Sequence, residues 1–225
     1  MPKSKKPESK KLASRRFANY LPRLLLALSA VLMIIGLGLA FHQQQVNVQT
    51  VKQATASGLA PSTVKPAPSQ MDTYTVAPDL PRYLIIPKLT VKARVGAVGL
   101  TKAGAIGSPT NVYDTDWYNG SSKPGQPGVT LIDGHVSSWT THGVFYSLDK
   151  LQAGDAIQIE RGDGALLNYS VVKTQTYDAD NIDMSAVLSP VDPTKSGLNL
   201  ITCAGDVIKG TNEFNERIVI FASQV

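Results

Sequence analysis

The chain has little cysteine, few aromatic residues and little charge for its length of 225 residues. Cys203 is the only cysteine, which excludes a disulfide framework and a zinc site built from several cysteines. Aromatic residues make up 7% and charged residues 17% of the chain, whereas hydrophobic residues make up 43%. This hydrophobic content is normal for globular proteins and excludes disorder of the whole chain. The length allows one ordinary domain with an appendage, or two small domains at most.

Acidic residues are scarce at the N-terminus, and this scarcity explains why the chain as a whole is basic. Residues 1–23 contain eight Lys and Arg residues but only one acidic residue, Glu8, which gives this tail a net charge of +7. The remaining 202 residues have a net charge of −2, although the whole chain has +5. A basic tail on a slightly acidic body does not predict a nucleic-acid-binding domain.

An uncharged run, residues 24–41, directly follows the basic tail. Its 18 residues would form a helix about 27 Å long, just enough to cross the hydrocarbon of a bilayer. The sequence therefore predicts an uncleaved transmembrane anchor, although a cleaved signal peptide, with a shorter apolar region, and a buried soluble helix are alternatives. The positive-inside rule predicts that residues 1–23 are cytoplasmic and that the chain after Phe41 lies outside the cell membrane.

The chain outside the membrane divides into two parts. Residues 42–80 are rich in Gln, Thr, Ser, Ala and Pro and have little apolar periodicity, so we predict a flexible linker there. From residue 81 onward, short apolar runs recur between Gly, Pro and Asp residues, and long helical periodicity is nearly absent. The pattern predicts an all-β domain over residues 81–225, a closed or nearly closed barrel of about seven or eight strands with short helices.

Several segments of this domain have clear strand or helix signals. The run 155–160 alternates polar and apolar residues, and a Gly-containing turn separates it from a second strand at 166–173, which indicates a hairpin. Residues 144–151 and 184–188 each suit a short turn of helix. Further strands are predicted at 83–86, 129–132, 198–202 and 217–222.

Cys203 ends the apolar run 198–203, and turn residues follow it. A free cysteine at such a position is often a small buried hydrophobe. A lone thiol outside the membrane is exposed to oxidation, however, and catalytic groups often lie where a strand meets a loop. A catalytic nucleophile and a buried structural residue therefore both remain possible from this position alone.

A thiol nucleophile needs a base, and acyl transfer needs a donor for the developing oxyanion. His135 follows the apolar strand 129–132 and a glycine, whereas His42 lies at the membrane edge and His142 in a polar loop. A turn histidine without catalytic function is the alternative for His135. Arg217 opens the strand 217–222 and shares its apolar face, where a guanidinium is costly unless it is paired or faces a cleft.

The order of these residues disfavours one family of cysteine proteases, and a missing motif disfavours a second. His135 precedes Cys203 by 68 residues, and Arg217 follows Cys203 by 14. Papain-like enzymes have the opposite order of Cys and His, and caspases require a Gln-Ala-Cys-x-Gly motif that this sequence lacks. The chain resembles the sortases, membrane-anchored cysteine transpeptidases of Gram-positive-type bacteria. Five segments carry the resemblance: 82–88, 133–135, 143–149, 200–203 and 217–222.

The resemblance implies an activity and a set of site residues. The substrate would be a surface protein with a Leu-Pro-x-Thr-Gly-like sorting signal, and the acceptor an amine of a peptidoglycan precursor or of a pilin. Cys203 would be the nucleophile, His135 the general acid and base, and Arg217 the oxyanion or substrate-positioning group. Thr202 and Ile201 would contact the substrate. Loop lengths and the segment 143–146 resemble class F most, and class E or D less.

The sequence departs from the family pattern at two positions. Asn199 replaces the first Thr of the Thr-Leu-x-Thr-Cys pattern. In some class F relatives the arginine lies two residues earlier, where this chain has Asn215. Residues 215 and 217 share a strand face, so Arg217 is expected to reach the same cleft.

Other features leave alternatives open. The acidic run 178–183 resembles a loop near which some sortases bind calcium, but it lacks the glycine and final glutamate of an EF-hand loop, so we expect a solvated loop and no metal or other cofactor. A non-catalytic, membrane-tethered adhesion domain would have the same anchor and linker. A Cys/His cell-wall peptide hydrolase would use the same pair of residues with water as the acceptor.

Overall fold

The computed structural model describes residues 60–225, together with Met33 and Gly36. The predicted cytoplasmic tail, almost all of the predicted anchor and the first part of the predicted linker therefore lie outside the described residues. Among the described residues, no helix is both long enough and apolar enough to span a bilayer.

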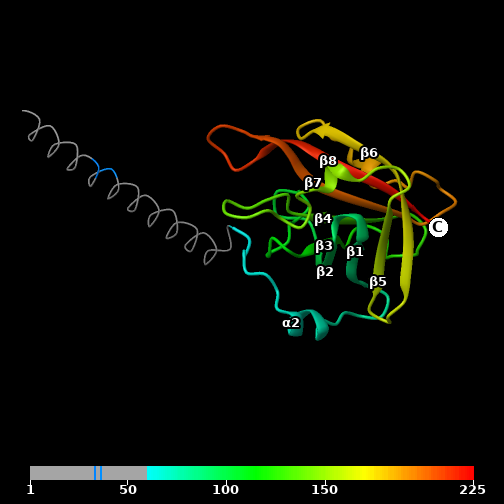
Figure 1. Cartoon of the computed structure of the whole chain (residues 1–225). Coiled ribbons are helices and arrows are strands. Elements are labelled where there is room, and N and C mark those ends of the chain that lie inside the picture. The colour runs from blue at the N-terminus through cyan, green and yellow to red at the C-terminus, as the bar shows by residue number, and fades with distance from the viewer. Residues whose placement is uncertain (1–32, 34–35, 37–59) are drawn as a thin grey trace, which may run out of the picture. The chain divides into compact units, whose positions relative to one another are not determined.

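Eight strands form a closed barrel, as the sequence predicted (Figure 1). Around the barrel their order is β1-β2-β3-β4-β7-β8-β6-β5, and β5 closes it by pairing with β1. The pairs β2–β3 and β4–β7 are parallel, and the other pairs are antiparallel. The strands are β1 (Pro81–Ile86), β2 (Val91–Val98), β3 (Thr115–Tyr118), β4 (Val129–Gly134), β5 (Ala156–Arg161), β6 (Leu166–Asp178), β7 (Gly197–Val207) and β8 (Phe214–Gln224).

The helices of the described chain are short. Of the two helical turns predicted in the domain, 144–151 contains only the 3₁₀ turn η2 (Leu148–Lys150), and 184–188 contains α3 (Met184–Val187). A second 3₁₀ turn, η1 (Pro87–Leu89), connects β1 to β2, and α2 (Pro68–Asp72) precedes the barrel. Asp183 caps α3 by accepting hydrogen bonds from the backbone nitrogens of Ser185 and Ala186.

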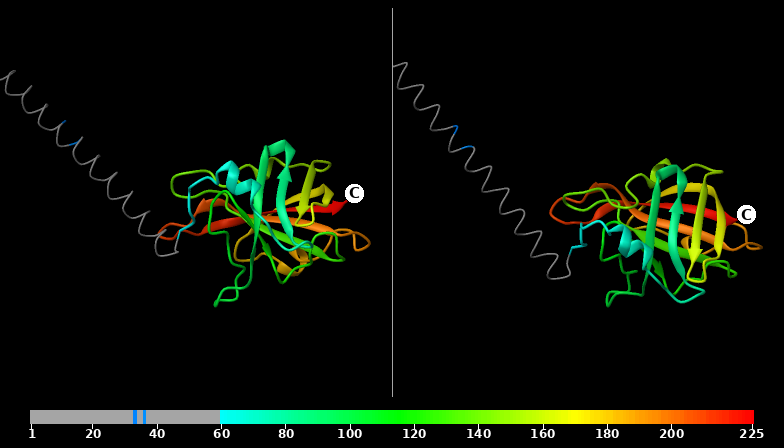
Figure 2. Two further views of the ribbon diagram at one scale, coloured as in Figure 1. Left: turned by 90° about the horizontal axis from the view of Figure 1, so that it is seen from below. Right: turned by 60° about the horizontal axis from the view of Figure 1, so that its bottom comes forward.

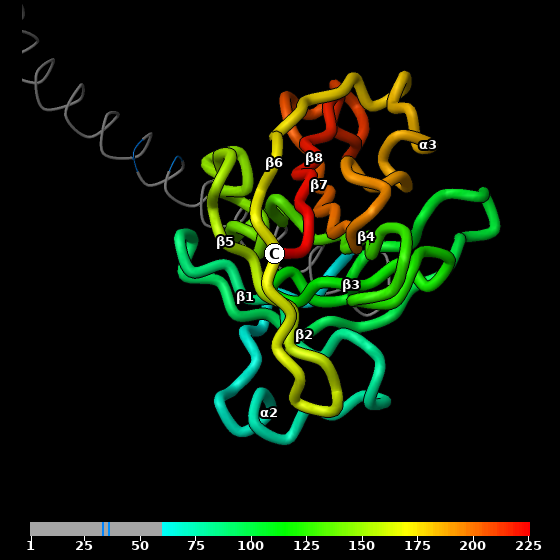
Figure 3. Tube along the Cα trace, turned by 90° about the vertical axis from the view of Figure 1, so that its right-hand side faces the viewer, coloured from blue at the N-terminus to red at the C-terminus, as the bar shows by residue number. Residues whose placement is uncertain are grey.

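Alternation along β7 builds two apolar clusters, one on each face of the strand. Leu198 and Leu200 are fully buried in the main core inside the barrel. Ile201 packs on the other face, in a smaller cluster around Leu131 and Phe221. This second cluster is covered by α3, which lies beside β7 in Figure 3.

Residues 60–80, which the sequence analysis assigned to the linker, pack against the barrel (Figure 2). The Tyr74 hydroxyl donates to the carbonyl of Val95 at 2.6 Å, and the buried Tyr83 hydroxyl donates to the carbonyl of Met71. Upstream of α2, the Ser62 nitrogen donates to the carbonyl of Thr110 at 2.7 Å. These contacts join the segment to the folded domain.

Candidate active site

Cys203 and His135 line one cleft of about 530 Å³ at neighbouring strands. Cys203 lies within β7, and His135 directly follows β4. The two strands run parallel and pair as far as Asp133 and Ile201, so Cys203 and His135 both come two residues after their last paired position. The sequence predicted a strand end for both residues, which is confirmed for His135 and wrong for Cys203, because β7 continues to Val207 through residues that were expected to form a turn.

A side-chain hydrogen bond joins these strands. The Thr202 hydroxyl donates to the carbonyl of Gly134 at 2.8 Å, and the Thr202 side chain is fully buried. Thr202 is therefore turned away from the cleft, whose described lining does not include it. Thr202 is therefore placed to hold β7 and the end of β4 in register.

The surroundings of Cys203 keep its thiol protonated at rest. Cys203 is half-buried, and burial raises the pKa of its thiol above the ordinary value of 9.0. The nearby Arg217 guanidinium lowers this pKa, but the carboxylates of Asp133 and Glu213 raise it. The thiolate therefore requires a base that removes the proton during the reaction.

The imidazole of His135 has a defined partner at one nitrogen. Its Nε2 atom lies 2.7 Å from the carbonyl oxygen of Pro109. Because a carbonyl oxygen only accepts, this contact requires the proton on Nε2 and leaves Nδ1 as the acceptor of the neutral ring. Nδ1 is thus the nitrogen that can take up a proton in the cleft.

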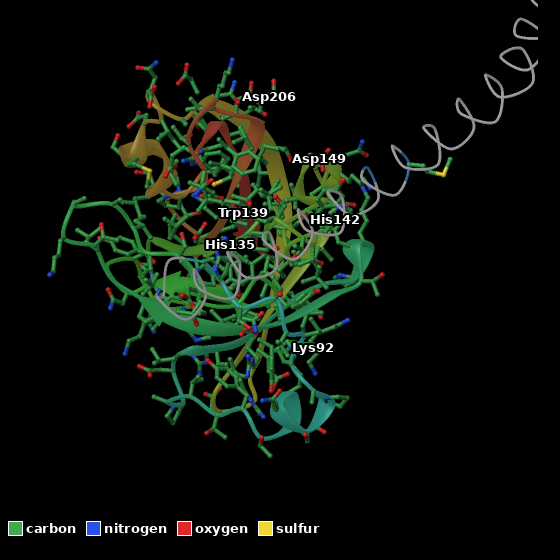
Figure 4. The ribbon with its side chains drawn as sticks, turned by 90° about the vertical axis from the view of Figure 1, so that its left-hand side faces the viewer. Lys92, His135, Trp139, His142, Asp149 and Asp206 are labelled. Carbon is green, nitrogen blue, oxygen red and sulfur yellow. The ribbon has the colours of Figure 1, made fainter. Side chains whose placement is uncertain are left out.

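The chain after His135 folds back on itself in a short hairpin, which we call the 136–143 loop. A β-bridge joins Ser137 to His142, and the nitrogen of Gly143 donates to the carbonyl of Val136 at 2.9 Å. A Cβ atom at Gly143 would collide with the carbonyl of His135, so the return of the loop requires glycine. Figure 4 shows His135, Trp139 and His142 on this side of the molecule, below Asp206 of β7 in this view.

Arg217 on β8 lies directly opposite Cys203 in the antiparallel pairing of β7 and β8. Its Nη1 donates to the carbonyls of Phe214 at 2.9 Å and Glu216 at 2.8 Å, and its Nη2 lies 3.9 Å from the carboxylate of Glu213. Only Nη1 makes hydrogen bonds in the described part of the chain, so the protons on Nε and Nη2 can be directed to a substrate. Arg217 stands beside the cleft, not in its lining.

Ile201 lies two residues before Cys203 and therefore on the same face of β7. It is partly buried in the outer cluster with Ile182 and Met184. The apolar face of β7 that carries Ile201 therefore lies next to the Cys203 thiol.

The sequence analysis missed Asp133, which lies two residues before His135. Burial raises the pKa of its carboxyl from 3.8 to about 6, while the charge of His135 and a hydrogen bond from the Ser108 side chain lower it. Its neighbour across the β3–β4 pair is Asp116, whose pKa is also raised, chiefly by burial. The Asp-Gly-His run places this carboxyl near the histidine, but the sequence did not show that Asp133 is partly buried.

The two departures from the family pattern have local roles. The Asn199 side chain is buried and donates from Nδ2 to the carbonyl of Val187 at 2.7 Å, which ties β7 to α3. The Asn215 side chain accepts from the nitrogen of Asp206 at 2.8 Å, beside the bulge of β7. Asn215 is therefore occupied with the backbone of the neighbouring strand.

The acidic run 178–183 has partners of its own. Asp178 accepts from the nitrogen of Asp180 at 2.9 Å, and Asp183 caps α3. Across residues 60–225, no three Asp, Glu, His or Cys side chains converge in a group that could hold a metal ion.

A thiol and an imidazole at two adjoining strands of a closed barrel define the site, and the sequence of the barrel can be compared with known families. The sortase domain family matches residues 84–225. The chain belongs to the sortase family. Sortases are cysteine transpeptidases that act on sorting signals and are typically extracellular and membrane-anchored, and the family thus accounts for a cysteine and a histidine in one cleft.

Solved structures show the same fold at low sequence identity. Sortase A from Corynebacterium diphtheriae, in a lid mutant, is 20% identical with a TM-score of 0.51, over 82% of this chain and 94% of that one. Sortase C from Streptococcus pneumoniae is 18% identical with a TM-score of 0.51, over 73% of this chain and 75% of that one. Sortase C-1 from Actinomyces oris is 19% identical with a TM-score of 0.50, over 79% and 98%. A comparison with curated proteins finds no match.

Proposed function

We propose that this sortase cleaves a C-terminal Leu-Pro-x-Thr-Gly-like signal between Thr and Gly and joins the acyl group to an amine. The observation that carries the proposal is the shared cleft of Cys203 and His135, which is open to solvent and large enough for a peptide. A half-buried thiol beside an imidazole is the arrangement that nucleophilic acyl transfer requires.

In the first half-reaction, His135 takes the proton from the Cys203 thiol, and Sγ attacks the carbonyl carbon of the signal's Thr. The tetrahedral intermediate then collapses with cleavage of the C–N bond to Gly. His135 returns the proton to the departing nitrogen, so that a thioester on Cys203 and a Gly-led peptide with a free amine are formed.

In the second half-reaction, an amine attacks the thioester carbonyl while His135 accepts one of its protons. The C–S bond breaks, an amide forms, and the Cys203 sulfur regains a proton from His135. A peptidoglycan precursor or a pilin lysine would supply the amine.

Arg217 and Ile201 serve the acyl side of this reaction. Arg217 lies opposite Cys203 on β8, so its remaining guanidinium protons can stabilise the oxyanion or hold the signal. Ile201 and the outer cluster provide an apolar surface for the Leu and Pro of the signal. Thr202 acts on the substrate through the position of Cys203, since its own side chain is buried.

The proposal includes the place of the enzyme in the cell. Residues 24–41 would anchor the protein in the cell membrane by a single span, with residues 1–23 in the cytoplasm and the barrel outside. We further assign the chain to class F, on the resemblance of its loop lengths and of residues 143–146.

The full chain in detergent micelles, incubated with a panel of sorting peptides and analysed by mass spectrometry, tests the proposal. We expect cleavage between Thr and Gly, and an amide product when triglycine is added. Cys203→Ala and His135→Gln should each abolish both, whereas His142→Phe should retain activity because it keeps an aromatic ring against Tyr146, on which His142 stacks at 3.4 Å. Free acid alone in the presence of amine would indicate a hydrolase, and absence of cleavage an adhesion domain.

A further inference from the structure

Trp139 is the exposed aromatic residue at the tip of the 136–143 loop, and it lines the same cleft as Cys203 and His135. Two-thirds of its surface (67%) is exposed, so the fold does not depend on its burial. A large apolar side chain that is exposed in a reaction cleft indicates a contact with a ligand.

The backbone of the loop is anchored on both sides of Trp139. Beneath the tip, the nitrogen of Ser138 donates to the carbonyl of Thr141 at 2.8 Å, and the Thr141 hydroxyl lies 3.2 Å from that of Tyr113. The ring of His142 stacks on Tyr146 with an angle of 6° between their planes. An aromatic side chain on an anchored hairpin loses little conformational entropy when it binds a ligand.

The position of the loop decides which substrate it meets. In the proposed reaction the acyl part of the signal is bound to Cys203 and extends toward Ile201 and its apolar cluster. The nitrogen that leaves or attacks must instead approach His135, which exchanges its proton. Trp139 lines the cleft with His135 and lies on the loop that begins directly after it, so in this scheme Trp139 is on the amine side of the reacting bond.

Other residues of the same cleft lining show what kind of amine fits. They include Phe214 and Glu213, whose side chain is 73% exposed and lies 3.9 Å from Nη2 of Arg217. A carboxylate and the face of an indole both attract an ammonium group, and the indole also packs against a peptide chain. Trp139 and Glu213 together therefore complement a peptide that carries a primary amine.

We infer that Trp139, together with Glu213, selects the amine acceptor of this sortase, with Trp139 in contact with the peptide chain of the acceptor and Glu213 with its ammonium group. The inference rests on the proposed transpeptidase function. Glu213 binds the ammonium form, which loses one proton to solvent water before it attacks. His135 receives the second proton from the nitrogen as the amide forms and passes it to the departing Cys203 sulfur.

Competition between two nucleophiles tests the inference with the full chain in detergent micelles. Hydroxylamine is a small nucleophile that has no peptide chain to pack against the indole and no N-terminal ammonium group to pair with Glu213. Triglycine has both. The measured quantity is the ratio of triglycine amide to hydroxamate formed from one sorting peptide. We expect Trp139→Ala to lower this ratio about tenfold, Glu213→Gln to lower it severalfold, and Trp139→Phe to preserve most of it.

Leu166→Ala on β6 is the matched control, because Leu166 is also a large exposed hydrophobic residue (47%) but does not line the cleft. It should leave the ratio unchanged. An unchanged ratio in Trp139→Ala, or an equal loss of both products, would overturn the inference while leaving the transpeptidase function in place. A wild-type enzyme that forms neither hydroxamate nor amide nor free acid would instead overturn the proposed function.

Discussion

The Thr202 hydroxyl donates a 2.8 Å hydrogen bond to the carbonyl of Gly134, and these residues directly precede Cys203 and His135. The bond thus links β7 to the end of β4, directly before the two residues that we propose to be catalytic. It is a local means of holding a thiol and an imidazole on separate strands in a fixed relation. A small displacement at such a position is costly, because proton transfer requires close approach.

Thr202→Val should reveal how much this hydrogen bond contributes to stability and how much to catalysis, since valine has nearly the same shape as threonine but cannot donate a hydrogen bond. The buried Gly134 carbonyl would lose its side-chain donor, and we expect the free energy of unfolding to fall by about 1–3 kcal/mol. We expect kcat for peptide cleavage to fall more than KM rises. Urea denaturation and steady-state kinetics measure the two quantities.

Thr202→Ser supplies the control, because it keeps the hydroxyl and removes only a methyl group. It should retain most of the stability and most of kcat. If Thr202→Val and wild type share the same kcat, the hydrogen bond has no part in positioning the proposed catalytic pair, Cys203 and His135.

The raised pKa of Cys203 predicts a slow reaction with alkylating reagents at neutral pH. Burial is the main cause, and it disfavours the thiolate. The rate of iodoacetamide labelling should therefore rise with pH through an inflection above 9.0, the ordinary value. Labelling followed by mass spectrometry across a pH series gives the titration curve.

Variants of the two flanking charges should move this inflection in opposite directions. Arg217→Gln removes the guanidinium that lowers the pKa of Cys203, so the inflection should shift upward. Glu213→Gln removes a carboxylate that raises this pKa, so the inflection should shift downward. If both variants gave the same pH dependence of labelling as the wild type, neither charge would act on the thiol.

Because the pKa of Asp133 is raised, we expect the free energy of unfolding to fall as the pH rises. Its folded-state pKa of about 6 exceeds the ordinary 3.8, so between these values the folded state binds more protons than the unfolded state. Stability then decreases through this window, in total by up to about 3 kcal/mol. Asp133→Asn should remove this dependence, which chemical denaturation at pH 4, 5, 6 and 7 measures.

Asp116→Asn is the comparison for this experiment, because Asp116 is the neighbour of Asp133 on β3 and its pKa is also raised by burial. It should flatten the dependence only in part. If the wild type and Asp133→Asn give parallel stability curves across the series, the carboxyl of Asp133 is not the titrating group.

Cys203 and His135 could be singled out from sequence because each follows an apolar run that forms a strand of the barrel. The predicted strand bounds were too short, since β7 continues past Cys203 to Val207 and β8 begins before Arg217, at Phe214. The placement of Thr202 and Ile201 was harder to predict. Alternation puts neighbouring residues on opposite faces, but only the pairing of β4 with β7 shows which face is the barrel interior.

The partly buried carboxyl of Asp133 and the ordered segment 60–80 could not be predicted from sequence, for another reason. Asp133 lies in an Asp-Gly-His run that suits a solvated turn, and its burial depends on β3, which is distant in sequence. Residues 60–80 contribute few apolar side chains to the barrel core, so their composition resembles that of a linker. They are held instead by hydrogen bonds to the barrel, which composition does not reveal.

This segment leads to a prediction about the minimal folded domain. A chain of residues 81–225 would lose the partner of the buried Tyr83 hydroxyl, the Tyr74 contact with Val95 and the pairing of Ser62 with Thr110. At about 1 kcal/mol for each hydrogen bond, it should be less stable than residues 60–225 by about 3 kcal/mol or more. Thermal and urea denaturation of the two fragments measure the difference.

A third fragment, residues 66–225, locates the source of this difference. It keeps α2, Tyr74 and the Met71 carbonyl but lacks Ser62, so it should recover most of the stability. It also lacks Ala60 and Pro61, which line the cleft beside Cys203 and His135. The thiol of 66–225 should therefore be labelled faster than that of 60–225 at the same pH, even though the two fragments differ little in stability. Equal labelling rates would mean that residues 60 and 61 do not restrict access to Cys203.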